Sequence, residues 1–207
     1  MKLKVCGMKY PENIIDVAKL HPDYMGFIFW EKSARYFNGI IPDLPESIEK
    51  VGVFVDATFR EIVSKVRKYQ LDIVQLHGNE QPELCKELKQ LFENIKIIKV
   101  FSIGEDFDFN RLVPYETSCD YYLFDTKGEL PGGNGLPFNW QILERYPYSK
   151  PFFLSGGVGI EEHPKIKELI ETGLPIHSID INSKFELEPG LKYIDAIKRF
   201  KYEIDFL

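Results

Sequence analysis

The sequence lacks long apolar runs, and this absence excludes a class of protein. Its longest apolar stretch, residues 25–30, is far shorter than the roughly 18 residues that a membrane-spanning helix requires. The first residues also lack the apolar stretch of about 7 to 15 residues that a secretory signal contains. We therefore expect no membrane partner and a cytoplasmic location.

Paired cysteines, metal-ligand spacings and basic tracts are missing as well. The three cysteines form no Cys-x-x-Cys pair and are odd in number, which indicates free thiols in a reducing compartment. The four histidines show no spacing such as His-x-x-x-His, so neither a zinc site nor another metal is expected. A net charge of -6 without clustered Lys and Arg argues against a nucleic-acid partner. A small anionic substrate is compatible with this composition.

What is present is the composition of a soluble globular protein and the length of one domain, residues 1–207, with 44% hydrophobic and 28% charged residues. Eight short runs rich in β-branched and aromatic residues, bounded by Gly, Pro or polar residues, have the pattern of buried parallel strands. The predicted strands are residues 3–7, 25–30, 51–56, 73–78, 95–101, 121–126, 151–156 and 178–182.

Helical periodicity separates most of these strands and is clearest at residues 58–69, 81–92, 161–172 and 190–200. Only residues 37–50 separate the second and third strands, and they contain one glycine and two prolines, which predicts a short or irregular second helix. The alternation favours an α/β fold, a single (β/α)8 TIM barrel. A doubly wound open sheet is the alternative.

In such a barrel the chemistry gathers where strands end, and two candidate catalytic residues lie there. Cys6 ends the first predicted strand, where a cationic environment can make its thiolate a base. Taken alone, one cysteine is more often an inert buried residue, as expected for Cys85 and Cys119. Asp125 ends the sixth strand, where a half-buried carboxyl can hold and donate a proton near neutral pH. Its alternative role is to anchor the next loop.

Candidate ligand-binding residues follow the seventh and eighth strands, where barrels commonly bind phosphate through backbone N–H groups. A tight turn that needs positive φ is the alternative explanation for the two glycines. The predicted substrate-binding residues at these two strand ends are Gly156, Gly157, Asp180, Asn182 and Ser183.

Three further features lie near predicted strand ends. Arg35, after the second strand, can form a bidentate contact with a substrate carboxylate, although a solvated arginine is commoner. Residues 131–135, rich in glycine, can fold over a ligand as a lid or form a plain loop. His77 can line the pocket or, as we slightly prefer, form hydrogen bonds in the core.

Taken in order, these segments resemble one known family over essentially the whole chain. The matching stretches are KVCGM at 4–8, GFIF at 26–29, KSARY at 32–36, VGVFV at 51–55, VQLHGNE at 74–80, LFDTK at 123–127, GGNG at 132–135, FNW at 138–140, LSGG at 154–157 and DINS at 180–183, with Glu186 and PG at 189–190. They closely resemble the phosphoribosylanthranilate isomerase family.

The resemblance implies a cofactor-free Amadori rearrangement of a phosphosugar in tryptophan biosynthesis. N-(5-phosphoribosyl)anthranilate would become 1-(2-carboxyphenylamino)-1-deoxyribulose 5-phosphate. Asp125 is then expected to protonate the furanose oxygen as general acid, and Cys6 to remove the C2 proton as general base. The order of strands in a barrel places the phosphate site between these two residues, and Arg35 is expected to hold the anthranilate carboxylate.

Two features depart from the family pattern, and two other functions stay open. Lys184 stands where a small residue is usual, and the segment between Arg35 and Val51 is shorter than is common. One alternative function is another phosphosugar barrel isomerase that uses two aspartates, which Cys6 disfavours. The other is a non-catalytic phosphate-ligand-binding barrel, which the presence of both Cys6 and Asp125 disfavours. A monomer is expected.

Overall fold

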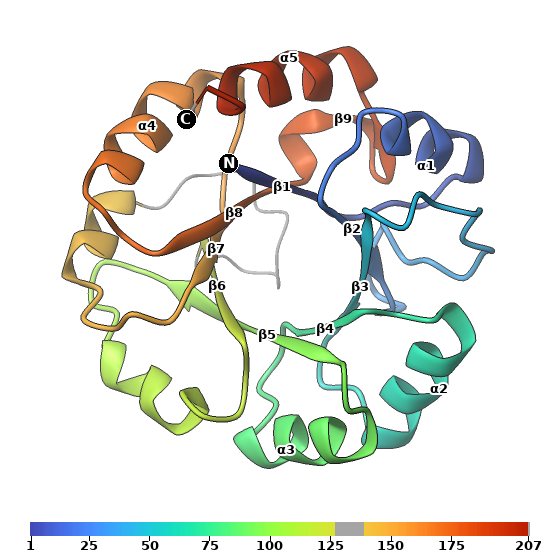
Figure 1. The fold of residues 1–207 in the computed structure, drawn as a ribbon, viewed down its shortest axis with the longest axis horizontal. Coiled ribbons are helices and arrows are strands. Elements are labelled where there is room, and N and C mark those ends of the chain that lie inside the picture. The colour runs from blue at the N-terminus through green and yellow to red at the C-terminus, as the bar shows by residue number, and fades with distance from the viewer. Residues whose placement is uncertain (127–138, 207) are drawn as a thin grey trace.

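The computed structural model describes residues 1–126 and 139–206, and eight parallel strands in it form a closed barrel in chain order. The last strand pairs with the first and closes the ring, and helices surround it on the outside (Figure 1). The predicted (β/α)8 barrel is therefore confirmed. The strands are β1 (Lys2–Val5), β2 (Tyr24–Ile28), β3 (Glu49–Phe54), β4 (Ile73–Leu76), β5 (Lys96–Ile103), β6 (Tyr121–Thr126), β7 (Phe152–Leu154) and β8 (Ile176–Ile181).

The connections between strands contain both α-helices and short 3-10 helices. The α-helices are α1 (Pro11–Ala18), α2 (Phe59–Tyr69), α3 (Pro82–Leu91), α4 (His163–Glu171) and α5 (Ile194–Ile204). The 3-10 helices are η1 (Phe109–Tyr115), η2 (Trp140–Arg145), η3 (Ile160–Glu162) and η4 (Ser183–Phe185). A small hairpin, β9 (Glu186–Glu188) and β10 (Leu191–Lys192), precedes the last helix.

Local sequence signals explain where the clearest helices begin. Thr58 caps α2, since its hydroxyl accepts from the N–H of Glu61 while the Glu61 carboxylate accepts from the backbone N–H of Thr58, a capping box. Pro11 and Pro82 occupy first-turn positions of α1 and α3, where the missing N–H of proline has no helical partner to lose. These starts agree with the predicted helices to within one residue for α2 and α3.

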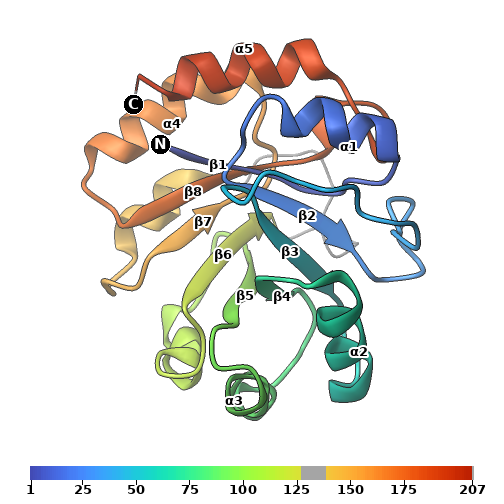
Figure 2. The same ribbon diagram turned by 45° about the vertical axis from the view of Figure 1, so that its right-hand side comes forward.

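The sequence predicted a short or irregular second helix, and the structure shows an irregular segment in its place. All of residues 29–48 are described, and none of them is helical. Phe37 fixes this segment instead, because its buried ring packs 5.0 Å from Phe27 and 5.7 Å from Tyr69. Tyr69 also donates a hydrogen bond to the carbonyl of Gly39 at 3.2 Å. Figure 2 shows the segment as an extended loop on the flank between α1 and α2.

The predicted final helix over 190–200 was wrong at its start. The structure places α5 at Ile194–Ile204, and Gly190 lies instead in the turn of the β9–β10 hairpin with φ of +91°. A Cβ at position 190 would lie 2.8 Å from the Cβ of Lys9. Glycine is therefore required at this turn by both its φ and its packing, and not as a helix residue.

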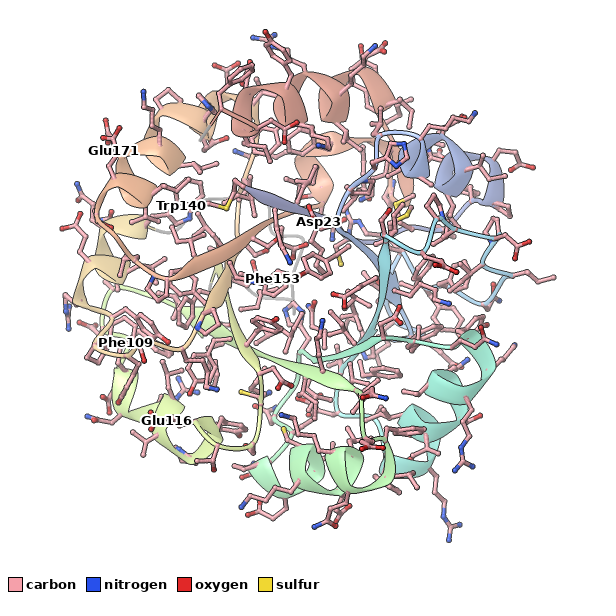
Figure 3. All side chains as sticks on the ribbon, in the orientation of Figure 1. Asp23, Phe109, Glu116, Trp140, Phe153 and Glu171 are labelled. Atoms are coloured by element: carbon pink, nitrogen blue, oxygen red, sulfur yellow. The ribbon has the colours of Figure 1, made fainter. Side chains whose placement is uncertain are left out.

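The core has two layers, one inside the barrel and one between the strands and the surrounding helices. Phe153, labelled near the middle of the ring in Figure 3, belongs to the inner layer together with Ile98 and Leu123. Cys85 and Cys119 are buried free thiols of the outer layer, in agreement with prediction. Among the described residues, no helix combines the length and the apolar composition that crossing a bilayer requires.

Candidate active site

A cavity of about 260 Å³ lies at the carboxyl ends of the strands and brings the predicted site residues together. The predicted catalytic and substrate-binding residues that line it are Cys6, Arg35, Asp125, Gly156, Gly157, Asp180, Asn182 and Ser183. The glycine-rich residues 131–135, predicted as a lid or a plain loop, lie outside the described residues. All eight site residues thus share one cavity, as the topology of a barrel requires of residues at strand ends.

Cys6 follows the last residue of β1 and is only 4% exposed. Its backbone N–H donates to the carbonyl of Ile181 on β8 at 2.9 Å, which continues the pairing of these two strands. On the other side, a Cβ at Gly26 of β2 would lie 2.8 Å from the sulfur of Cys6. Glycine at position 26 therefore provides the space that the thiol occupies.

Charged neighbours oppose the effect of burial on this thiol. Burial raises the pKa of Cys6, while the ammonium groups of Lys4 and Lys192 lower it and the carboxylate of Asp180 raises it further. The net direction is upward. Cys6 is therefore favoured as a neutral thiol at neutral pH, and the two lysines make its thiolate less costly than burial alone would.

Asp125 lies near the end of β6 and is 6% exposed. Its Oδ1 accepts from the backbone N–H of Thr126 at 2.9 Å. Nε2 of His77 is 3.3 Å from Oδ2, although the two groups are not aligned for a hydrogen bond. A Cβ at Gly156 would lie 3.2 Å from Oδ1. The carboxyl is thus held against the cavity wall by its own backbone and by a turn that approaches it closely.

Asp180 on β8 interacts by charge with both candidate catalytic residues, Cys6 and Asp125. Its Oδ1 accepts from the ammonium of Lys4 at 2.8 Å. Burial raises the pKa of Asp180, Lys4 opposes this, and the nearby charge of Asp125 adds to it. Lys4 in turn interacts with Cys6 by charge. The buried Lys4–Asp180 ion pair therefore interacts by charge with both candidate catalytic residues.

Arg35 is engaged by a carboxylate that our sequence analysis gave no role. Its Nε and Nη2 donate to Glu186 at distances of 2.7–2.9 Å, and Lys192 donates to Glu186 at 2.7 Å and to the side-chain oxygen of Asn182 at 2.8 Å. Burial raises the pKa of Glu186, but Arg35 and Lys192 outweigh it and leave the pKa below its ordinary value. Glu186, ionised at neutral pH, thus orients the guanidinium, whose remaining N–H groups stay available for a ligand.

The turn after β7 and the segment after β8 form the predicted phosphate side of the cavity. Gly156 and Gly157 have φ of +83° and +72°, a backbone conformation that favours glycine. Lys184, which departs from the family pattern, forms an ion pair with Glu162 at 2.8 Å. Its charge is therefore partly compensated by η3, and it is neither a free cation nor a side chain directed only to solvent.

We expect Gly156→Ala to raise KM and to reduce the free energy of unfolding. The new Cβ would lie 2.4 Å from Oγ1 and 2.6 Å from the backbone nitrogen of Thr126, so the turn beside Asp125 must shift. Steady-state kinetics and urea unfolding measure the two effects. Gly173→Ala is a matched control: Gly173 has φ of +79° but no atom within 4 Å of an added Cβ, so it should show only the roughly 1–2 kcal/mol of left-handed strain and an unchanged KM. Equal effects of both substitutions on KM would contradict this prediction.

Comparison with known proteins agrees with the geometry. The family model of N-(5'phosphoribosyl)anthranilate (PRA) isomerase matches residues 3–202. The N-(5'-phosphoribosyl)anthranilate isomerase of Parabacteroides distasonis is 42% identical over 210 residues, which cover 99% of this chain and 93% of that protein. That of Phocaeicola vulgatus is 41% identical over 200 residues, which cover 97% of this chain and 96% of that protein.

A solved structure shows the same similarity in three dimensions. The phosphoribosyl anthranilate isomerase of Thermotoga maritima superposes with a TM-score of 0.82 at 30% identity, with 100% of both chains covered. The match extends from β1 to α5 and so includes every element that surrounds the cavity. On the family match and these relatives, the chain belongs to the N-(5'-phosphoribosyl)anthranilate isomerase family.

Proposed function

We propose that this chain catalyses the isomerisation of N-(5'-phosphoribosyl)anthranilate to 1-(2-carboxyphenylamino)-1-deoxyribulose 5-phosphate in tryptophan biosynthesis. The observation that carries the proposal is the shared cavity of Cys6 and Asp125, with the glycine turn and Arg35 on its walls, in a chain of this family. A cavity of this kind supplies one acid, one base, backbone donors and one fixed cation to a single small ligand.

Asp125 acts first in this proposal, as general acid. Its carboxyl donates a proton to the furanose ring oxygen, and the bond between that oxygen and C1 breaks as the nitrogen lone pair forms an iminium. Cys6, as thiolate, then takes the proton from C2, and the electrons of the C2–H bond form an enolamine that tautomerises to the ketone. Atoms and electrons balance between substrate and product, so the rearrangement requires no cofactor in this scheme.

The remaining predicted residues bind the two anionic ends of the substrate. In this proposal the backbone N–H groups of Gly156, Gly157 and Ser183, which line the cavity, donate hydrogen bonds to the phosphate, and the ionised Glu186 orients Arg35 toward a carboxylate. Asp180 and Asn182 line the same cavity as substrate-binding residues, each with a lysine partner. Binding both ends fixes the sugar between acid and base, which converts proton transfer into an intramolecular step.

The test of this function is the consumption of phosphoribosylanthranilate by the purified protein, followed by anthranilate fluorescence. We expect turnover without an added metal or cofactor and no turnover of the aminoaldose of histidine biosynthesis. Turnover of the second substrate alone would favour another phosphosugar isomerase. Tight binding of a product analogue without any consumption of substrate would favour a non-catalytic binding barrel.

Arg35→Lys is expected to raise KM by roughly 10-fold, because a lysine loses the bidentate contact with a carboxylate, worth about 1–3 kcal/mol. The control is the substrate analogue that lacks the carboxylate, N-phosphoribosylaniline. Its KM should change little between wild type and Arg35→Lys. An equal rise in KM for both substrates would show that Arg35 maintains the cavity through Glu186 and does not bind the carboxylate.

We also propose that residues 1–207 form one domain that acts as a monomer in the cytoplasm. The closed barrel joins both ends of the sequence through β1 and β8, which supports a single domain. The buried free thiols Cys6, Cys85 and Cys119 are compatible with a reducing compartment. Sedimentation velocity should give the mass of one 24.1 kDa chain, and twice that mass would refute the monomer.

A further inference from the structure

A fully buried lysine lies inside the barrel directly below the candidate base. Lys4 is 0% exposed, and its ammonium donates to Asp180 at 2.8 Å. Lys4 and Asp180 are opposite each other in the pairing of β1 with β8, which are neighbours in the ring (Figure 1). Because side chains alternate along a strand, Lys4 and Cys6 point to the same face of β1. The ammonium of Lys4 also lowers the pKa of the Cys6 thiol.

The other cations near the thiol, within the part of the chain that the structure describes, hydrogen-bond to different partners. Lys192 of β10 interacts with Cys6 by charge, but its hydrogen bonds go to Glu186 and Asn182. Arg35 is held by the same Glu186. Among the described cations whose charge acts on Cys6, Lys4 is therefore the one that lies two residues before the thiol and on the same face of β1.

Stability alone does not explain why the Lys4–Asp180 ion pair is buried. A buried lysine and carboxylate lose hydration that their mutual attraction offsets only in part, and well-packed apolar residues in the same space are often as stable. Lys4 occupies a position in the inner barrel where apolar residues such as Ile98, Leu123 and Phe153 otherwise fill the space. The burial of the Lys4 ammonium near the Cys6 thiol therefore indicates a functional role.

We propose that Lys4 is a positioning residue whose ammonium stabilises the thiolate of Cys6, and that Asp180 holds this ammonium in place. The proposal rests on the proposed role of Cys6 as the base. In the C2 deprotonation an S–H bond forms as the C2–H bond breaks, while Lys4 keeps its proton throughout. Asp180 then remains as the counter-charge of Lys4 when the thiolate has been neutralised.

Titration of Cys6 in the substrate-free protein tests this inference. The ultraviolet absorbance of the thiolate is followed against pH, with the Cys6→Ser protein subtracted to remove the other two cysteines. Loss of a nearby opposite charge shifts a pKa by about 1–3 units, so Lys4→Met should move the midpoint upward by that amount. Asp180→Asn should move it downward, because it removes a negative charge near the sulfur and frees Lys4 to interact with the thiolate.

If the Lys4–Asp180 ion pair had only a structural role, the two substitutions would not shift the titration midpoint of Cys6 in opposite directions. Lys99→Met is the matched control, since Lys99 is also a buried strand lysine paired with a carboxylate, Glu80 at 2.8 Å, on the outer side of the barrel. It should leave the midpoint unchanged. Shifts in the same direction, or no shift in either variant, would overturn the proposal.

Kinetics adds a second readout. In Lys4→Met the acid limb of kcat/KM should move upward in step with the thiol, so that activity partly recovers at high pH, whereas Lys4→Arg keeps the charge and should keep the limb near its wild-type position. If Lys4→Met does not fold, Lys4→Gln takes its place in the same titration, and an unshifted midpoint in that variant would contradict the proposal. If Cys6 titrates as expected but Cys6→Ala remains active, the proposed base is wrong and the link between Lys4 and the thiol stands.

Discussion

Cys6→Ala is expected to lower kcat by about 10²- to 10⁴-fold, the usual contribution of one positioned base, with little change in KM. The methyl group cannot accept the C2 proton, while the anionic ends of the substrate still find their contacts. Cys6→Ser should retain only a small activity, because a hydroxyl is a much weaker acid than a thiol. Initial rates of phosphoribosylanthranilate consumption over a range of concentrations measure both constants.

The matched controls are the other two cysteines. Cys85 and Cys119 are as buried as Cys6 but lie in the outer layer, where burial raises the pKa of Cys85 to about 11 and that of Cys119 to about 12. Replacing either by alanine should reduce stability and leave kcat unchanged. A Cys6→Ala protein as active as these controls would remove Cys6 from the mechanism.

Asp125→Asn should lower kcat by a similar factor, because an amide cannot protonate the ring oxygen and the furanose then stays closed. The substitution conserves shape, and an amide oxygen can still accept the hydrogen bond from Thr126 that fixes the side chain at 2.9 Å. KM should therefore change little. The same rate assay, with a binding measurement of a product analogue, separates the loss of turnover from a loss of binding.

Asp120→Asn is the control for this substitution. Asp120 immediately precedes the same strand, β6, at its opposite end, and its carboxylate pairs with Lys89 at 2.8 Å. Its replacement should affect stability by at most about 1 kcal/mol, the usual range for a partly exposed ion pair, and leave kcat unaltered. If Asp125→Asn retained wild-type kcat, ring opening would have to occur without this acid.

Much of the fold was predictable because strand burial and helix starts are local properties. The sixth strand was predicted at residues 121–126 and is observed with these bounds, since polar residues flank its apolar run on both sides. The eighth begins two residues earlier than predicted, at Ile176, because the polar His177 interrupts its apolar pattern. His177 is accommodated by its contact with Tyr24 at 2.8 Å, a partner 153 residues away that no local pattern reveals.

The candidate site also contains residues that the sequence predicts and residues that it does not. The residues that line the cavity could be predicted, because any strand end in a barrel faces the same rim. The residues that support them could not, since Lys4 and Asp180 are 176 positions apart and Glu186 is 151 positions from Arg35. One signal was available: a lysine between Leu3 and Val5, in a strand that must be buried, is a charge that requires a partner.

The pairing of β1 with β8 also determines when this protein can first act. Cys6 lies near the start of the barrel in chain order, whereas Asp180 and Lys192, which surround it in the finished barrel, lie near its end. Until the residues of β8 and the segment after it have been translated, the cavity around the thiol is incomplete and lacks part of its proposed substrate-binding residues. We therefore expect a fragment that ends before residue 180 to be inactive. It contains both proposed catalytic groups, but without β8 the barrel cannot close around them.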